Sequence, residues 1–565
     1  MIENRNKAKL IAGFISSLKK SFRLEWTSYS FLAVVSFGIS RQLSRFGFYA
    51  VEEWAVYSSR IPLRATWAYV SGDATSDPRF RFGAGSLSFL PFNWITSFIE
   101  FFIRDPVTVI RISIAIPILA TGLSTYLFIK QFVDSRMVAL SSAVFVQTSL
   151  YTIIGWTSTP KAYSIPLFVT IFVYSSTKFK SRCKSILVGI AIFTPFVSVV
   201  ANPPALIASM LGFPLGAIYG LSVLRDQSNT RLKEVINELA TKSIALVLIF
   251  APWLYVQYRE ITSKALPSQI FDYTGDPLKN LLLNIAGRGY WWEYAGSEGF
   301  RFNPFIDALD LPLVWIGRYI VFLIATFGFI YFVVEVVSRR LQQRARKIKD
   351  VLKAKQVIAF YSMTIVLLIF SGPQDRVPFF VQLGNKFKIL HMFREPLPKF
   401  NGIYIWLLAI TFAAILGYIS TESAVKKRRF QFVKPRLFVL AVSSFILISS
   451  LIPITQSSFS FEKGSIYSVS LERVHLAHAI ANRINTEKIQ YCVTVEGYES
   501  GGLPQEAANS LRILMIFING KSDSWLIPGT ISNESTFQCK PSEAVVAIER
   551  NGEFSFTQSH ETQGG

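Results

Sequence analysis

Charged residues are scarce in this 565-residue chain. Only 17% of the residues are Asp, Glu, Lys or Arg, whereas 51% are hydrophobic and 15% are aromatic. About a quarter of the residues in a soluble domain are charged, so the composition argues against an ordinary soluble protein and favours one that lies in a bilayer. Apolar stretches of roughly twenty residues recur between short charged loops, and each such stretch predicts a membrane-spanning helix.

Metal-binding and nucleotide-binding motifs are also missing. The four histidines and three cysteines form no ligand cluster, and there is no phosphate-binding loop or glycine-rich dinucleotide motif. Chemistry driven by ATP or by a redox cofactor is therefore unsupported. We expect no metal site and no cofactor, with a divalent metal left open, so an activated substrate would have to bring its own leaving group.

No cleavable signal peptide is recognisable. Residues 1–25 are basic, and their apolar patch over 10–18 is short and interrupted by polar residues. We expect this segment to form a cytoplasmic amphipathic helix on the inner leaflet, followed by a first span that is retained.

About eleven spans are predicted by length and apolar character. They cover approximately residues 26–47, 107–130, 137–156, 162–177, 185–201, 204–224, 243–259, 313–338, 356–371, 402–420 and 436–456. Every strongly basic loop falls on one side if the N-terminus is cytoplasmic, which is the distribution typical of the inner face. The formal net charge of +22 is therefore explained by a cytoplasmic fringe, and we expect no nucleic-acid partner.

The expected fold class is an all-α polytopic membrane protein, N-terminus inside and C-terminus outside, with a small exterior α/β domain. The transmembrane domain covers residues 26–457, with long exterior loops over 48–106, 260–312 and 372–401, and the exterior domain covers 458–565. In that domain the pattern predicts a helix over 470–484 and strands over 489–495, 544–549 and 553–557. Cys492 and Cys539 are either a disulfide, which the exterior would permit, or two buried thiols.

An acidic pair, Glu52-Glu53, follows the first predicted span and is the candidate catalytic base. Two adjacent carboxylates repel one another, so in an apolar setting one of them should have a raised pKa, which suits a group that accepts a proton near neutral pH. The alternative is that one Glu pairs with Arg45 and the other is solvated. Asp73 and Asp77 are second candidates, although an Asp before Pro is more often turn chemistry.

Cations and aromatic residues in the predicted exterior loops, and Arg45 in the outer half of the first span, are candidates for substrate binding. Arg45 and Arg394 offer planar forks for a phosphate, and Lys399 offers a second cation. Arg45 and Lys399 are equally well explained as interfacial residues. Trp291 and Trp292 present flat rings that suit a sugar, but the same residues form aromatic belts on many membrane proteins.

These features together resemble the GT-C class of membrane glycosyltransferases, which use polyprenyl-phosphate-linked sugars. Arg45 with Glu52-Glu53 matches the arginine and acidic residues of that class. Within it, the chain is similar to the arabinofuranosyltransferase-like group over roughly residues 26–456. The matching residues are Trp67, Gly83, Gly85, Phe89, Pro91 and Phe92 in the first loop, and Phe393, Arg394, Pro396 and Phe400 in the late loop. The chain differs in carrying Glu where relatives often carry Asp, and in lacking a very large exterior region.

The resemblance implies an integral cell-membrane enzyme whose active face lies outside the cytoplasm. Its partners would be the lipid bilayer, a polyprenyl-phosphate sugar donor and a glycan or glycoconjugate acceptor. Two other readings stay open. A transporter or flippase for lipid-linked glycans would have charges spread over several spans and often inverted repeats. A non-catalytic membrane subunit would only present its C-terminal domain to a partner.

Overall fold

The structure is a computed structural model. It describes residues 25–42, 47–49, 98–99, 101–103, 105–130, 132–149, 152, 282–283, 285–287, 311–341, 361–362, 364–365, 386, 396–425, 435–455, 468–488, 491–495, 507, 510, 514, 544–549 and 553–557.

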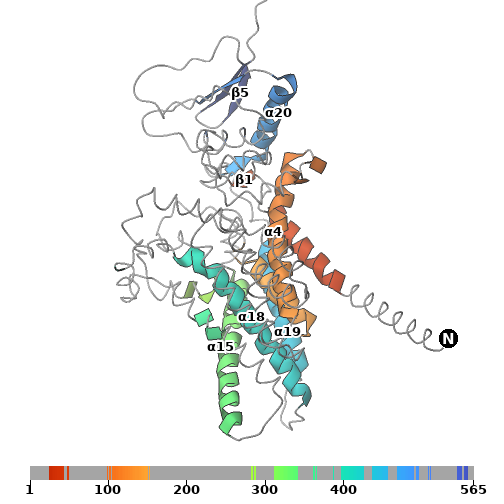
Figure 1. Ribbon diagram of the computed structural model, residues 1–565, viewed down its shortest axis with the longest axis vertical. Coiled ribbons are helices and arrows are strands. Elements are labelled where there is room, and N and C mark those ends of the chain that lie inside the picture. The colour runs from red at the N-terminus through yellow and green to blue at the C-terminus, as the bar shows by residue number, and fades with distance from the viewer. Residues whose placement is uncertain are drawn as a thin grey trace, which may run out of the picture.

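Most of the apolar helices come first in the described chain, and a small α/β part comes last. In chain order they are helix 25–42, β1 (Gly47–Tyr49), α4 (Pro106–Lys130), α5 (Arg136–Gln147), α15 (Pro312–Leu341), α18 (Pro396–Val425), α19 (Pro435–Thr455), β2 (Ser468–Ser470), α20 (Leu471–Glu487), β3 (Tyr491–Val495), β4 (Ala544–Ile548) and β5 (Phe554–Thr557). Figure 1 shows α20 and β5 at one end of the long axis, with α15 and much of α18 and α19 toward the other.

Four of the described helices are long and apolar enough to cross a bilayer, and they identify a membrane protein. The apolar stretches are Val107–Lys130, Pro312–Tyr331, Gly402–Ser420 and Pro435–Thr455. The helices that contain them, α4, α15, α18 and α19, each begin at a proline. Proline is well suited to the first position of a helix, because the N–H group that it lacks would have no partner inside the helix there.

Helix α18 is the centre of this bundle. It contacts α4, α5, α15 and α19, and all its residues from Ile403 to Leu416 are buried. Helices α15 and α19 instead expose large apolar side chains such as Phe327 and Ile448. A helix that is buried all round and helices with apolar outer faces are the pattern expected of a bundle surrounded by lipid.

Helix α5 packs on α4 and α19, and one buried amide bonds it to two of its neighbours. The Nε2 atom of Gln147 donates to Ser36 Oγ at 2.8 Å, to Ile118 O at 3.1 Å and to Leu32 O at 3.4 Å. Gln147 packs directly against Gly122 of α4, because a Cβ atom at Gly122 would lie 2.2 Å from Nε2. The first span, α4 and α5 therefore meet at a single polar side chain.

The ends of the described helices fall into two groups. At one end, which we call the domain end, Gln42 of helix 25–42 donates to Ile454 O of α19 at 3.3 Å. The start of α15 belongs to the same end, since Gly317 touches Ser449 near the close of α19. The start of α4 lies there as well, because α4 contacts α20. Which end faces the cytoplasm stays a prediction from the basic loops.

The predicted span over 137–156 is interrupted, which corrects the sequence interpretation. Helix α5 ends at Gln147, Thr148 and Ser149 form a turn, and Thr152 is helical again. Twelve residues extend about 18 Å, which is less than the roughly 30 Å hydrocarbon core. The backbone N–H groups of Thr148 and Ser149 donate to Val144 O and Val146 O, and the hydroxyls of the same two residues donate to the same carbonyl oxygens. Such side-chain bonds are a usual way to end a helix inside a protein.

Two boundaries at the domain end also differ from the prediction. Gly47 was expected at the end of the first span, but it is the first residue of β1. The segment 396–401 was expected in an exterior loop, but α18 begins at Pro396. The prolines and the lysine of this segment are typical of a loop, but prolines are also tolerated in the first turn of a helix.

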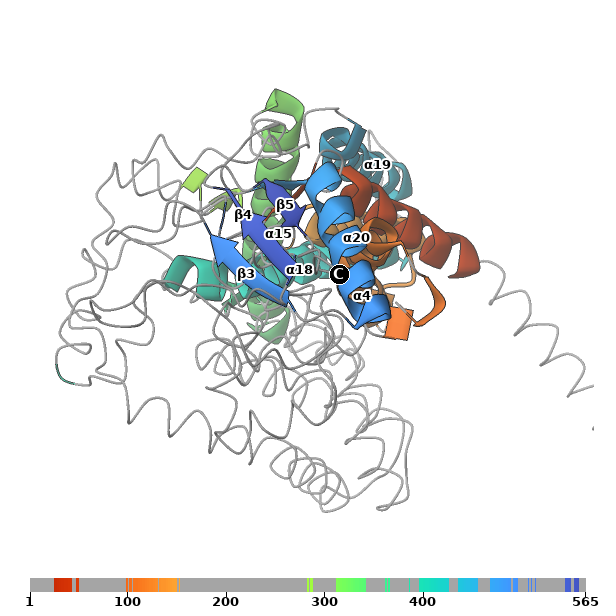
Figure 2. The ribbon, with the colours of Figure 1, turned by 90° about the horizontal axis from the view of Figure 1, so that it is seen from above.

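The C-terminal part contains the predicted helix and strands. Helix α20 begins with Ser470 as its cap, whose side chain accepts from Arg473 N, and it packs against β2 and β5. Strand β4 is central in the sheet, parallel to β3 and antiparallel to β5. Figure 2 shows this sheet and α20 seen from above, over the ends of the apolar helices. The expected spans over 162–177, 185–201, 204–224 and 243–259 lie outside the described residues, and 356–371 is described only at 361–362 and 364–365.

Candidate functional site

The strand β1 joins the end of the first span to the C-terminal part of the chain. It pairs antiparallel with β2, with Gly47 opposite Ser470 and Tyr49 opposite Ser468. Helix 25–42 leads into β1, and β2 leads directly into α20. The segment that precedes the acidic pair Glu52-Glu53 is thus part of a sheet at the domain end.

The start of α4 makes a second connection at this end. Asp105 caps the helix: its Oδ2 accepts from Thr108 N at 2.8 Å and from Thr108 Oγ1 at 2.5 Å. Partial burial raises the pKa of Asp105, but the hydrogen bonds from Thr108 and the attraction of His475 outweigh burial and lower the pKa below its ordinary value. Since His475 lies on α20, the C-terminal helix contributes to the electrostatics of the α4 start.

Most of the predicted site residues lie outside the described part of the chain. These are Arg45, Glu52, Glu53, Asp73, Asp77, Trp291, Trp292, Arg394 and Cys539. Two others have a described backbone: Lys399 lies in the first turn of α18, and Cys492 lies in β3 opposite Val545. The proposed roles of all these residues, including the disulfide, stay predictions.

The chain just before the predicted aromatic segment is bonded to two spanning helices. Three side chains donate to its carbonyl groups: Tyr319 to Leu282 O at 3.3 Å, Tyr404 to Ile285 O at 3.3 Å, and Arg318 to Ala286 O at 2.9 Å. Tyr319 and Arg318 come from α15, and Tyr404 comes from α18. We call residues 282–283 and 285–287, a helical segment and the turn that ends it, the anchored turn.

Arg318 is a charged side chain inside a spanning helix, and it is only 4% exposed. Its Nη2 donates to Thr148 O at 3.1 Å, at the point where α5 is interrupted, and its guanidinium lies 5.5 Å from the centre of the Phe145 ring. The sequence shows Arg318 as one of few charges in the predicted spans, but gives it no role. A charge at membrane depth is itself the signal of a functional position.

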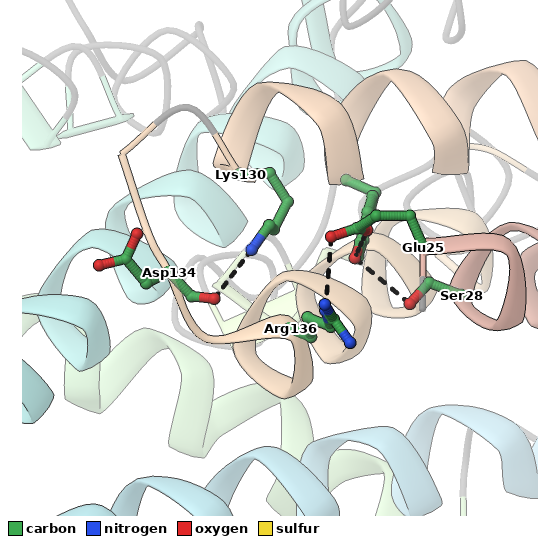
Figure 3. Close-up of polar contacts among 6 residues, drawn as sticks. Glu25, Ser28, Lys130, Asp134 and Arg136 are labelled. Carbon is green, nitrogen blue, oxygen red and sulfur yellow. Dashed lines mark hydrogen bonds and ion pairs between the residues drawn. The ribbon is translucent and has the colours of Figure 1, made fainter. Parts of the chain in front are cut away.

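A separate polar cluster lies at the opposite end of the bundle (Figure 3). The Tyr126 hydroxyl donates to the Glu25 carboxylate, and Ser28 Oγ lies 3.2 Å from the same hydroxyl oxygen. Arg136 Nε lies 3.4 Å from Glu25 Oε1. Lys130 caps the turn between α4 and α5 by donating to Asp134 O at 2.8 Å. This cluster joins the start of helix 25–42 to the α4–α5 turn, so it has a structural role away from the domain end.

The described residues contain no group of three or more His, Cys, Asp or Glu that could hold a metal ion.

Comparison with known proteins gives a slight likeness to solved structures. No protein-family model matches the sequence, and no curated protein matches it. Among solved structures, the chain is similar to the arabinofuranosyltransferase AftD from Mycobacteria, determined by single-particle cryo-EM, with 11% sequence identity and a TM-score of 0.43. The likeness covers 84% of this chain and 29% of that chain, so this chain spans less than a third of that protein's length. A likeness of this size carries no argument about activity.

Proposed function

We propose that the chain transfers a sugar from a polyprenyl-phosphate-linked donor to a glycan, lipid or protein acceptor on the exterior side of the cell membrane. Glu52 or Glu53 is the proposed general base, with Asp73 and Asp77 as second candidates. No cofactor takes part in the proposed step.

The observation that supports this proposal is the position of β1. It ends at Tyr49, three residues before Glu52, and it is paired with β2 at the domain end of the apolar helices. A donor whose lipid chain lies in the bilayer presents its phosphate and sugar at such an end. An acidic pair that follows a paired strand there suits a reaction at the membrane surface.

The proposed step is a direct displacement. A carboxylate of the acidic pair takes the proton of an acceptor hydroxyl, and the acceptor oxygen forms a bond to the anomeric carbon of the donor. The bond between that carbon and the phosphate oxygen breaks, and the polyprenyl phosphate leaves with the electron pair. Cations that stabilise the departing phosphate make the main electrostatic contribution.

The proposed cations are Arg394, Arg45 and Lys399. Lys399 belongs to the first turn of α18, which begins two residues after Arg394. The rings of Trp291 and Trp292 are the proposed surface for a sugar. These two residues lie four and five positions after Gly287, the last residue of the anchored turn. The described elements that lie nearest to the proposed groups in the sequence are therefore β1, the start of α18 and the anchored turn.

The test is sugar transfer in membranes by the full chain and its Glu52→Gln, Glu53→Gln and double variants. The donors are farnesyl phosphates that carry arabinose, mannose or glucose, and the acceptors are the matching octyl glycosides. We expect the double variant to lose about 100-fold or more of the rate with the active donor, which is the usual contribution of a general base. The matched control is Glu472→Gln, in the first turn of α20, which should keep the rate. Full activity in the double variant would refute the proposed base.

One observation favours a second function, that of a transporter or flippase for lipid-linked glycans. Transporters often bind their substrates at interrupted helices near the middle of the membrane, and α5 is interrupted where Arg318 is buried. Proteoliposomes loaded with a fluorescent polyprenyl-phosphate sugar distinguish the two. Movement of the lipid without transfer of its sugar would favour the transporter, and a chain that does neither would favour the non-catalytic subunit.

A further inference from the structure

Arg318 bonds to two segments that are distant in the sequence. Its Nη1 donates to Ala286 O at 2.9 Å, in the anchored turn, and its Nη2 donates to Thr148 O at 3.1 Å, at the interruption of α5. Lys has a single nitrogen on a flexible stem, whereas the arginine fork reaches two carbonyl groups at once in a fixed geometry. The Arg318 side chain therefore connects the anchored turn and the interruption of α5 to helix α15.

The depth of Arg318 makes this arrangement costly. The residue lies six positions beyond Pro312, about 9 Å along α15 from its start, within the apolar stretch Pro312–Tyr331. A charged group at membrane depth is expensive, and such residues in spanning helices are usually retained for a function. Packing alone would be served by an apolar side chain of similar volume.

The anchored turn has little freedom to move. Gly287 has a φ of +70°, and a Cβ atom there would lie 2.9 Å from Ile405 Cγ1 and 3.4 Å from Arg318 Nη1. A side chain at this position would be strained in backbone conformation and would collide with α18. The backbone passes between α18 and Arg318, so these two neighbours set the direction in which the chain leaves the turn.

The anchored turn and the start of α18 are each followed or preceded closely in the sequence by proposed substrate-binding groups. Tyr404 and Ile405 of α18 contact the turn, and the same helix begins two residues after Arg394. The chain that leaves the turn reaches Trp291 four residues after Gly287. The contacts of α15 and α18 with the turn therefore fix the described chain next to both segments in the sequence.

We propose that Arg318 is a positioning residue for sugar binding: by joining the anchored turn and the end of α5 to α15, it sets where the segment carrying Trp291 and Trp292 begins relative to α18. This inference rests on the proposed function. Arg318 acts through the turn and does not itself touch the reacting atoms. Its loss should therefore weaken acceptor binding more than it slows the chemical step.

The experiment measures the order of the turn and the kinetics of transfer in the same full-length variants. A keto-reactive spin label on p-acetylphenylalanine at position 282 reports on the turn without touching the three native cysteines, because the Leu282 side chain is 41% exposed. The variants are Arg318→Met, Arg318→Lys and Tyr319→Phe. Tyr319→Phe removes one solvent-exposed bond to the turn and keeps the aromatic ring, so we expect this variant to fold.

The matched control is Tyr361→Phe. Tyr361 is buried and donates to Thr326 Oγ1 at 2.8 Å, so the control removes a bond to the same helix α15 but none to the turn. We expect it to leave both the spectrum of the label and the KM for the acceptor unchanged.

Arg318→Met should give a label spectrum with a larger mobile fraction and a KM for the octyl glycoside acceptor raised about tenfold or more, with kcat within about threefold of the wild type. Arg318→Lys should fall between Met and wild type, and Tyr319→Phe should change the spectrum slightly in the same direction. An unchanged spectrum or an unchanged KM in Arg318→Met would overturn the inference, as would a fall in kcat alone. A wild-type chain that transfers no sugar would refute the proposed function instead, and the label would then decide by itself whether Arg318 anchors the turn.

Discussion

The contact between Gly122 and Gln147 gives a sharp prediction, because a single methyl group should break the polar contact of three helices. A Cβ atom at position 122 would lie 2.2 Å from Gln147 Nε2, 2.3 Å from its Cδ and 2.8 Å from its Cγ. Non-bonded heavy atoms normally approach only to about 3.5–4.0 Å. In Gly122→Ala the amide therefore has to move by more than an ångström, away from its three acceptors.

The magnitude follows from the bonds that are lost. Hydrogen bonds between membrane helices contribute about 0.6 kcal/mol on average and at most about 1.7 kcal/mol each. Overpacking adds about 1–3 kcal/mol, and the better helix propensity of Ala offsets about 1 kcal/mol. We expect Gly122→Ala to lower the free energy of unfolding by about 2–3 kcal/mol.

A compensating variant makes the prediction specific. Gln147→Ala removes all three atoms with which the new methyl group collides, so Gly122→Ala should cost little in a Gln147→Ala background. The double-mutant cycle should give a coupling free energy of about 2 kcal/mol in favour of the pair. Gly38→Ala is the matched control, because its Cβ atom would meet only Ile454 Cγ2 at 3.3 Å.

The assay is reversible unfolding in mixed dodecylmaltoside–SDS micelles, followed by tryptophan fluorescence, with the free energy taken from its dependence on the SDS mole fraction. Gly122→Ala within about 0.5 kcal/mol of the wild type would refute the predicted collision, since this is the usual size of a neutral substitution. Additive effects of the two substitutions would show that the side chains do not compete for one space.

Two further predictions concern the ends of the bundle. Asp105→Ala should lower the free energy of unfolding by about 1 kcal/mol at pH 7 through loss of the helix cap. Because the folded pKa of Asp105 is lowered, the stabilisation by its carboxylate is present above the unfolded pKa and should disappear as the pH falls below about 4. Unfolding curves of both proteins between pH 3 and 7 measure this loss. At the opposite end, Tyr126→Phe should lower the free energy of unfolding by about 1 kcal/mol, because it removes the bond to Glu25. Lys130→Met loses only an exposed bond to Asp134 O and should change the free energy of unfolding by less than about 0.5 kcal/mol. Equal effects of these two variants would contradict the structural role of the Glu25 cluster.

The helices were predictable where their signal is local. Pro106, Pro312 and Pro435 mark the starts of α4, α15 and α19 within one residue of the prediction, because apolar length and a proline at the first position are visible in the sequence. In the C-terminal part, α20 and the three strands were confirmed for the same reason: their periodicities lie within each segment.

The interruption of α5 was not predictable from its own residues. Thr148 and Ser149 are compatible with a helix, and one contact at the break, from Arg318 to Thr148 O, comes from another helix. The anchored turn is equally non-local, since its three donors come from α15 and α18. Residue-level site predictions such as Glu52 rest on the sequence and the resemblance, and they await the transfer assay.

The pairing of β1 with β2 has a consequence for biosynthesis. Gly47 leaves the ribosome before nearly all the apolar helices, whereas its partner Ser470 emerges after all those described here. The strand that precedes the acidic pair must therefore wait, unpaired, until the last spanning helix has been inserted and the following segment has reached the same side of the membrane. A chain that stops before Ser468 could insert its apolar helices and still lack the partner of β1, so the proposed activity would be absent from incomplete chains and would arise only in the last stage of assembly.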